Sequence, residues 1–263
     1  TSLYIFQYTG SEFIYVSRLV GTHCGLLAPG AFAKSSGRAF WMSGHAFHMS
    51  AGGPPEPIPN QDDVLDTVLA DMDPDQTAKT WAEYIEKSDQ IRWHYVSNDS
   101  SNDEPDKYVD VNLGDYSWTT GTEDATTGTS YRPADSSRIF VDVDGAIFLA
   151  PVGVDANGAA MSASLSWGLY ALSRGEQNVD VMGLVPDCQR QTGDLVFTVE
   201  TYERPNSASA FDSGATTLSE GDEIADIRVS GRHFTMSMAS NEIGGDFWLG
   251  IPGLEVGTAG ERR

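Results

Sequence analysis

Short apolar runs separated by turn residues dominate the first part of the chain. They pair into four predicted hairpins, whose strands are Leu3–Tyr8 with Phe13–Leu19, Ala39–Met42 with Ala46–Met49, Ile91–Val96 with Tyr108–Asn112, and Ile139–Val143 with Ala146–Ala150. Small and polar residues join the strands, and Asp144-Gly145 is a dipeptide that favours a type I′ turn. The pattern predicts antiparallel β-structure.

Aromatic residues recur at similar places in these hairpins. Trp41, Trp93 and Phe140 are separated by 52 and 47 residues. Four-stranded units that repeat every 40 to 50 residues or so are typical of a β-propeller. We therefore expect a partial propeller in residues 1–155, and the alternative is an ordinary sandwich built of hairpins.

A helical segment interrupts the strands at about residues 60–86. Apolar residues of Asp62–Met72 fall on one helix face, Asn60 is the expected cap, and Asp73-Pro74 is the expected stop. A second helix is predicted over Gln76–Glu86. The pair is interpreted as an insertion that packs on its own propeller blade, and a contact with a neighbouring subunit is the alternative.

The pattern changes near Ala156, where longer strands begin. They are predicted at Met161–Leu172, Leu195–Glu203, Ile224–Val229, Phe234–Ala239, Asp246–Leu249 and Leu254–Val256. Strict alternation of apolar and polar residues indicates strands with one buried face and one solvent-exposed face. The expected fold is all-β: a partial β-propeller with a short helical insertion in 1–155, followed by a β-sandwich platform domain in 156–263.

The charge of the chain restricts its partners. The 263 residues contain 38 acidic and 16 basic side chains, and the net charge is −22. Residues 56–144 contain 21 acidic and six basic side chains, which give −15 of that charge. Such a chain does not hold DNA through a basic patch. Its acidity serves either solubility or the repulsion of a polyanion. No run of apolar residues has the length of a membrane span.

Two further features concern the chain as a whole. Cys24 and Cys188 lie far apart and have no zinc-ligand spacing, so two buried free thiols are favoured over one long-range disulfide. The sequence starts directly in a strand pattern. We therefore expect a C-terminal fragment of a longer protein, with a β-rich extension upstream of Thr1.

The carboxylates offer no distinct catalytic pair. Glu83, Glu86, Asp142 and Asp144 are available for glycoside hydrolysis, which uses two carboxyl groups, but nothing in the spacing selects two of them. A chain with 38 acidic residues brings some together by chance. Nucleophile elbows and phosphate-binding loops are also missing from the sequence.

Metal ligation is not indicated either. Asp142-Val-Asp144-Gly145 resembles the start of a calcium loop, but position 12 is Gly153 instead of the bidentate Glu. Asp73-Pro-Asp75 is explained by the end of the helix. The histidines, which are His23, His45, His48, His94 and His233, are interpreted as polar or half-buried residues. The sequence therefore predicts a protein that is not an enzyme, with no catalytic, cofactor-binding or metal-binding residues.

Several motifs, taken in order, resemble a known family. They are Phe40-Trp-Met-Ser-Gly-His-Ala-Phe-His-Met-Ser-Ala-Gly-Gly53, the apolar-acidic helix Val64–Met72, Arg92-Trp-His-Tyr95, Asp106-Lys-Tyr-Val-Asp110, Trp118-Thr-Thr-Gly121, Ser230-Gly-Arg-His-Phe234, Gly245-Asp-Phe-Trp-Leu-Gly250 and Gly260-Glu-Arg-Arg263. This order resembles tail nozzle or tail-hub proteins of short-tailed phages (podophages), similar to tail tubular protein B and to packaged-DNA stabilisation proteins. Asn112-Leu-Gly-Asp-Tyr116 and the acidic loops depart from the pattern.

The resemblance implies a structural virion protein in the phage tail. Members of this family carry a β-propeller and a β-sandwich platform, and assemble as rings, usually hexamers. The ring conducts the genome during ejection without binding it specifically, and contacts the head-to-tail adaptor and fibre or needle proteins. Arg262-Arg263 is a candidate contact for an acidic partner. The alternative is a carbohydrate-binding or glycan-cleaving propeller used in host attachment.

Overall fold

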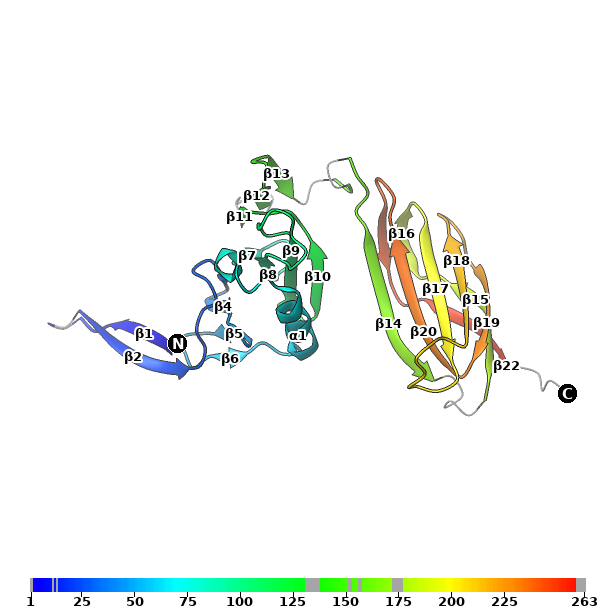
Figure 1. The fold of residues 1–263 in the computed structure, drawn as a ribbon, viewed down its shortest axis with the longest axis horizontal. Helices are drawn as coiled ribbons and strands as arrows, with labels where there is room; N and C mark the ends of the chain where they lie inside the picture. The colour runs from blue at the N-terminus through cyan, green and yellow to red at the C-terminus, as the bar shows by residue number, and fades with distance from the viewer. Residues whose placement is uncertain are drawn as a thin grey trace. The chain divides into compact units, whose positions relative to one another are not determined.

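The computed structural model describes residues 2–10, 12, 14–130, 138–150, 153–155, 158–171 and 177–258. In this part of the chain the structure is all-β apart from one α-helix and one short 3-10 helix (Figure 1). The chain divides into an N-terminal unit, Thr1–Val152, and a C-terminal unit, Gly153–Arg263. Some residues named in the sequence predictions lie outside the described residues. They are Phe13, Ala156, Leu172 and the ending Gly260–Arg263.

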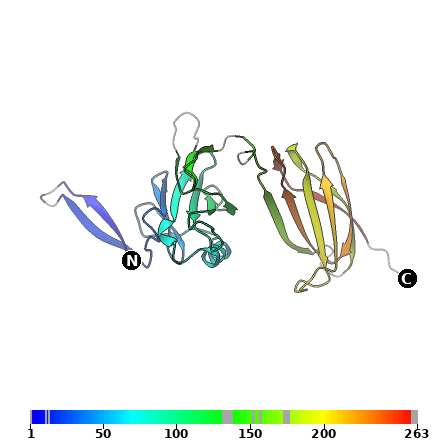
Figure 2. The ribbon, with the colours of Figure 1, turned by 45° about the horizontal axis from the view of Figure 1, so that its top comes forward.

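The N-terminal unit begins with an isolated hairpin. Strands β1 (Ser2–Tyr8) and β2 (Tyr15–Thr22) pair with each other in antiparallel register and form a two-stranded sheet of their own. Figures 1 and 2 both show them as a separate ribbon. The predicted first hairpin is therefore confirmed.

Three antiparallel sheets follow, each with its strands in sequence order. The first meander sheet contains β3 (Phe32–Ser35), β4 (Arg38–Met42), β5 (Phe47–Ser50) and β6 (Glu56–Pro57). The second contains β7 (Trp81–Ile85), β8 (Gln90–Tyr95), β9 (Lys107–Asn112) and β10 (Trp118–Thr122). The third contains β11 (Thr127–Ser130), β12 (Arg138–Val141) and β13 (Ile147–Ala150).

The three recurring aromatic residues occupy equivalent strands. Trp41 lies on β4, Trp93 on β8 and Phe140 on β12, so each is on the second strand of its meander sheet. The first strands of consecutive sheets contact each other, β3 with β7 and β7 with β11. The spacing in the sequence thus reflects a structural repeat.

The apolar core of the N-terminal unit lies between the first two meander sheets. Its largest fully buried side chains are Trp93, Phe40, Phe47, Met42, Ile58 and Ile91. Phe47 packs on the Trp93 ring at a centroid distance of 4.9 Å. The Trp93 indole Nε1 donates to the Ala31 carbonyl at 3.2 Å, so this polar atom is satisfied inside the core.

The helix α1 (Asp62–Asp71) packs on this core through the predicted face. Val68 and Met72 are buried, and Val64, Leu65 and Leu69 contact the cluster. The expected cap is wrong, because Asn60 adopts a positive φ of 58° and the helix starts after Gln61. The Gln61 side chain instead accepts from the Phe47 amide and donates to the Ile58 carbonyl.

The second predicted helix, Gln76–Glu86, is wrong. The segment forms a 3-10 turn, η1 (Thr77–Lys79), and then strand β7. Pairing with β8 overrides the helical spacing, because Trp81 lies opposite His94 and Glu83 lies opposite Arg92. As a strand, β7 turns Ala82 and Tyr84 toward the apolar core and leaves Glu83 on the opposite face.

The turn between β12 and β13 also differs from the prediction. Gly145 has a positive φ of 81°, whereas Asp144 does not belong to the described residues with positive φ. A type I′ turn needs both. The Gly145 amide donates to the Asp142 carbonyl at 3.2 Å, and the Asp142 amide donates to the Ala146 carbonyl at 3.1 Å. The connection is therefore a type I turn followed by a left-handed glycine.

The C-terminal unit contains two larger sheets and a short ribbon. One sheet has the order β14 (Ala163–Ala171), β20 (His233–Ser240), β17 (Leu195–Tyr202) and β18 (Asp212–Leu218). The other has the order β19 (Ala225–Gly231), β15 (Val179–Val185) and β22 (Gly253–Thr258). The ribbon pairs β16 (Cys188–Thr192) with β21 (Asp246–Leu249). The sequence did not predict β15, β16 or β18.

One core joins the two larger sheets. Buried residues from β17 and β20 alternate with more exposed ones, as predicted, and meet buried residues from β15 and β19. Phe197 and Leu195 are fully buried there, whereas Val196 between them is 42% exposed. Both cysteines are free thiols, as the sequence favoured, but only Cys24 is buried as predicted, because Cys188 in this unit is half-buried.

The alternation along β17 can be tested with two neighbouring substitutions. Phe197→Ala leaves a cavity in the C-terminal core and is expected to lower the free energy of unfolding by about 3–5 kcal/mol. Val196→Ala removes a partly exposed side chain and is expected to cost less than about 1 kcal/mol. Urea unfolding of the full chain, followed by tryptophan fluorescence and circular dichroism, measures both. Equal costs would contradict the assigned faces.

Candidate functional site

The candidate carboxylates do not form one group. Glu83 is buried on β7, whereas Glu86 and Asp144 are exposed. The Asp142 carboxylate accepts from the Ala146 amide at 2.8 Å and so stabilises its own turn. The turn interpretation of Asp142-Val-Asp144-Gly145 therefore accounts for these residues.

Two histidines, His45 and His48, lie near each other at the end of the first meander sheet. Their ring centroids are 6.0 Å apart, and the His48 ring also stacks on Trp41. His45 Nε2 lies 2.6 Å from the His23 carbonyl, and His48 Nε2 lies 3.2 Å from Ser43 Oγ. Within the described residues, no group of three or more His, Cys, Asp or Glu side chains is arranged to hold a metal ion.

The most concentrated charged site lies between the second and third meander sheets. We call it the ionic cluster, and its members are Glu83, Arg92, His94, Asp110, Glu123 and Arg138. Strands β7, β8, β9 and β12 and the segment after β10 supply these residues. Alternation along β7, β8 and β9 turns them to the face opposite the apolar core.

Arg138 is the centre of the ionic cluster. This residue is 2% exposed, and its guanidinium donates to both oxygens of Glu123 at 2.8 and 2.7 Å and to Glu83 through Nε. Because Arg138 comes from β12 and Glu83 from β7, the contact connects the third meander sheet to the second. The bidentate geometry is the strong form of an arginine–carboxylate pair.

Arg92 forms the second half of the cluster. Its Nη2 and Nε atoms lie 2.7 and 3.2 Å from the two oxygens of Asp110, and its Nη1 lies 3.3 Å from Glu123. The guanidinium carbon also lies 3.6 Å from the ring centroid of Tyr108. Glu123 thus contacts both arginines, and the two ion pairs form one network.

His94 lies in the network as a neutral ring. Its imidazole stacks on Trp81 at 4.0 Å, and its Nε2 lies 3.3 Å from Glu83. Burial lowers its pKa, although contacts with Glu83 and Glu123 act in the opposite direction. Its Nδ1 atom is buried without a hydrogen-bond partner among the described residues.

Two carboxylates of the cluster, Glu83 and Glu123, are held in the charged state. Burial alone would raise the pKa of Glu83 and Glu123, but contacts with Arg138 and His94 lower it overall. Burial raises the pKa of Asp110, and the bidentate Arg92 acts against that rise. General acid catalysis in glycosidases requires a carboxyl group that stays protonated. The arrangement is therefore suited to holding two sheets together.

Of this cluster, only Glu83 is a candidate carboxylate on the sequence alone. The sequence does not indicate a site role for Arg92, Asp110, Glu123 or Arg138. Arg92 and His94 alternate with apolar residues, which is also the pattern of a strand with one solvent-exposed face, so the sequence does not show that these side chains are buried. The burial of Glu83 depends on the pairing of β7 with β8, which the helix predicted over Gln76–Glu86 excludes.

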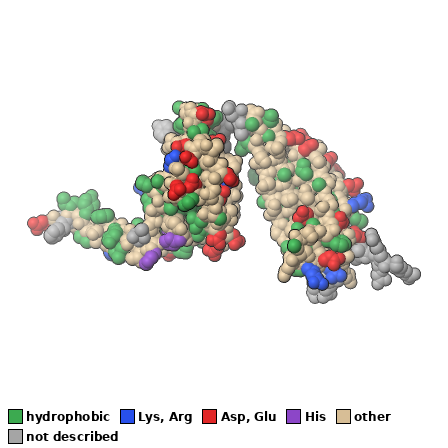
Figure 3. Space-filling view, in the orientation of Figure 1, with side chains coloured by type: hydrophobic (Ala, Val, Ile, Leu, Met, Phe, Trp, Pro, Cys, Tyr) green, Lys and Arg blue, Asp and Glu red, His purple; other side chains and the backbone are tan. Residues whose placement is uncertain are grey.

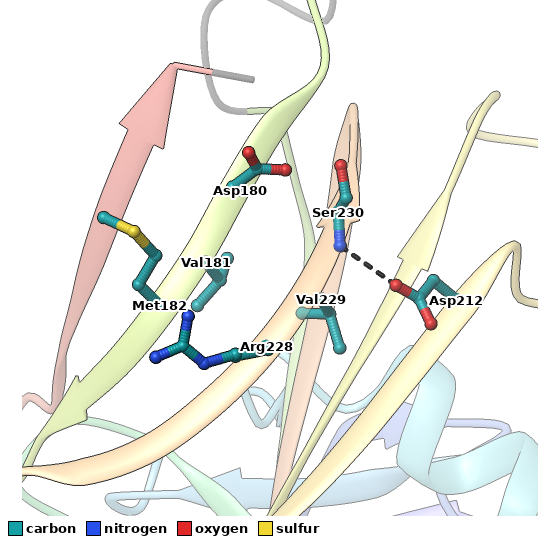
Figure 4. A pocket seen from close by; sticks show the side chains of 7 residues that line it. All are labelled: Asp180, Val181, Met182, Asp212, Arg228, Val229 and Ser230. Atoms are coloured by element: carbon teal, nitrogen blue, oxygen red, sulfur yellow. Dashed lines mark hydrogen bonds between the residues drawn. The ribbon is translucent and has the colours of Figure 1, made fainter. Parts of the chain in front are cut away.

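The C-terminal unit has a shallow depression of about 270 Å³. Figure 4 shows its lining residues, which are Asp180, Val181, Met182, Asp212, Arg228, Val229 and Ser230. The Ser230 amide donates to the Asp212 carboxylate at 3.1 Å, so this carboxylate connects β18 to β19 in the opposite sheet. The contact is explained by sheet packing.

Removing the shared cation tests the role of the cluster. Arg138→Leu leaves Glu83 and Glu123 buried without their main partner, and is expected to cost about 3–5 kcal/mol of unfolding free energy. The control is Arg190→Leu, whose pair with Asp246 is largely exposed at 63% for the arginine side chain; it is expected to cost at most about 1 kcal/mol. Chemical denaturation at neutral pH measures both. Similar losses would show that the cluster is not a structural centre.

The lowered pKa of His94 gives a pH dependence. An unfolded histidine has a pKa of 6.5, so the unfolded chain gains a proton first as the pH falls below that value. Stability is therefore expected to decrease on going from about pH 7 to about pH 5. His94→Gln should reduce the slope, and a part should remain because burial also lowers the pKa of His48. Urea titrations at several pH values measure the slope, and an unchanged slope would contradict the assignment.

Comparison with known proteins leaves the family open. The chain matches no protein-family model, and no curated protein sequence is significantly similar to it. No helix in the described ranges has the length and apolarity needed to cross a membrane.

Proposed function

We propose that this chain is a structural protein of a short-tailed phage tail, where copies of it form a ring-shaped nozzle or hub. The ring conducts the genome during ejection and anchors the tail to the head-to-tail adaptor and the fibres. The proposal rests on the order of the motifs from Phe40 to Arg263 and on the distribution of charge. The distribution of charge is its main support.

Buried and exposed charges differ in a way that suits a passive conduit. The buried arginines are paired with carboxylates, whereas the exposed charged side chains of the N-terminal unit are mainly acidic (Figure 3). The exposed acids around α1 and the loops of the second meander sheet include Asp62, Asp63, Asp66, Asp75, Asp99 and Asp103. A wall of this kind repels the phosphates of DNA, and clustered lysines and arginines would bind them.

The proposed fold is a partial β-propeller followed by a β-sandwich platform. The propeller is supported by three consecutive meander sheets whose first strands contact each other and whose second strands carry the recurring aromatic residues. The sandwich is supported by two antiparallel sheets with one shared core. With each meander sheet as a propeller blade, the ionic cluster lies between two adjacent blades.

The acidic segment is proposed to face the channel. Repulsion from the wall keeps duplex DNA near the axis and lets it slide, so the ring functions without a specific DNA site. This part of the proposal is separate from ring formation. A ring whose inner surface carries lysines and arginines along the DNA path would contradict the channel placement alone.

Imaging of the full-length protein tests the proposed function. We expect mass photometry and negative-stain electron microscopy to show hexameric rings with a hole wide enough for duplex DNA. Fluorescence anisotropy should detect no binding of a labelled duplex even at low salt, because the net charge is −22. A monomer that releases reducing sugar from bacterial surface glycans would overturn the proposal in favour of a glycan-cleaving propeller.

A further inference from the structure

The third meander sheet has one strand fewer than the two before it. The first and second sheets have four strands each, whereas the third ends at β13 after three. In the described part of the chain no strand pairs with the outer edge of β13. The position that β6 and β10 occupy in the other two sheets is therefore open in the third.

The open edge presents backbone groups that can pair. The Val141 carbonyl accepts from the Thr126 amide at 2.9 Å and so points away from β13. Val141 lies opposite Ile147, and alternation in an antiparallel ladder then turns the amide and carbonyl of Ile147 and of Leu149 to the outer edge. The two side chains are 74% and 45% exposed, and β13 carries no charge that would block pairing.

The same unit contains an apolar ribbon without a partner sheet. The hairpin β1–β2 forms no sheet with other strands, and large apolar side chains are exposed along it (Figure 3). They are Tyr4, Phe6, Tyr8, Ile14, Tyr15, Val16 and Leu19. An uncovered two-stranded ribbon is marginal in water, and its free edges are ready to pair with another sheet.

Charge favours a second copy of the chain as the partner. Residues 1–55 contain one acidic and three basic side chains, a net +2, whereas residues 56–144 carry −15. Arg18 is the one charged residue within strands β1 and β2, and it makes no salt bridge with the described residues. The turn before β13 carries Asp142 and Asp144. The hairpin of one copy therefore complements the third sheet of another.

We propose that β2 of one copy adds to β13 of the next copy as the missing fourth strand. This inference deepens the proposed ring, and rests on it only in requiring that copies of the chain associate. The Thr9 amide donates to the Ile14 carbonyl, so alternation along β2 turns the backbone groups of Val16 and Arg18 toward β1 and those of Tyr15 and Ser17 outward. An antiparallel pairing with Ile147 opposite Ser17 and Leu149 opposite Tyr15 therefore joins the outward groups of both strands. It places Arg18 opposite Ala146, beside the acidic turn. The donor and acceptor surfaces differ, so the contact is head-to-tail and generates a closed ring or a filament.

Two variants, each with one surface removed, test the pairing in the full chain. Ile147→Lys/Leu149→Lys blocks the β13 edge and Arg18→Glu repels the acidic turn. Analytical ultracentrifugation measures the association of each variant. For Ile147→Lys/Leu149→Lys we expect association weakened on the order of 100-fold, because two apolar side chains lose their contact. Ile243→Lys/Ile251→Lys, which changes two exposed apolar residues of the C-terminal unit, is the matched control and should assemble as the unchanged chain does.

Mixing tests the direction of the contact. The two defective variants, each with one intact surface, should form a one-to-one pair that does not grow. Arg18→Glu combined with Asp144→Arg in a single chain should recover assembly, since the charges are exchanged. Circular dichroism and thermal unfolding of each variant should match those of the unchanged chain.

Other results overturn the inference in distinguishable ways. Normal rings from the Ile147→Lys/Leu149→Lys variant reject the β13 edge but leave the ring proposal intact. An equal loss in the control indicates nonspecific apolar association and rejects the pairing. Failure of Arg18→Glu/Asp144→Arg to recover assembly rejects the placement of Arg18 beside the turn. A chain that stays monomeric at all concentrations rejects both this inference and the proposed ring.

Discussion

The guanidinium of Arg138 lies between the carboxylates of Glu83 and Glu123, and the packing of the second and third meander sheets depends on this contact. The second sheet has two buried faces of different chemistry. One meets the first sheet through Trp93 and its apolar neighbours, and the other meets the third sheet through ions. An apolar interface of the same size can be equally stable, because burying charges has a large desolvation cost. What the ions add is a fixed relative position, since a bidentate pair is satisfied in only one arrangement.

The ionic cluster contains two arginines and three carboxylates whose contacts depend on one another. Glu123 contacts both guanidinium groups, so loss of one arginine also changes the surroundings of the other. His94 stays neutral and fills the space between Trp81 and the carboxylates with a flat ring. Neutrality matters because a third cation would compete with Arg138 for Glu83. The six residues of the ionic cluster therefore depend on one another. A catalytic acid–base pair would need at least one group without such partners.

The sequence predicts the helices and strands that carry their own local signal. Leu195–Tyr202 alternates strictly and Asp62–Asp71 places its apolar residues on one helix face, and both were found as elements near the predicted bounds. Failures occurred where a distant segment decides the conformation. Ala78, Trp81, Ala82 and Ile85 fit a helix as well as a strand, and only pairing with β8 selects the strand. The predicted cap Asn60 is wrong for a similar reason, since the helix begins after Gln61, whose side chain accepts from the Phe47 amide on another strand.

Surface composition and internal pairing together constrain how copies of such a chain can meet. Two bodies with a charge of −22 each repel at most orientations, and screening weakens that repulsion only beyond about 8 Å at physiological salt. Close contact is therefore favoured where charge is absent or opposite. In the described part of the N-terminal unit, the β1–β2 ribbon and the β13 edge both meet that condition, and both carry exposed apolar side chains. Concentrating the acid elsewhere, on α1 and the neighbouring loops, leaves these strands available for pairing and directs association toward them.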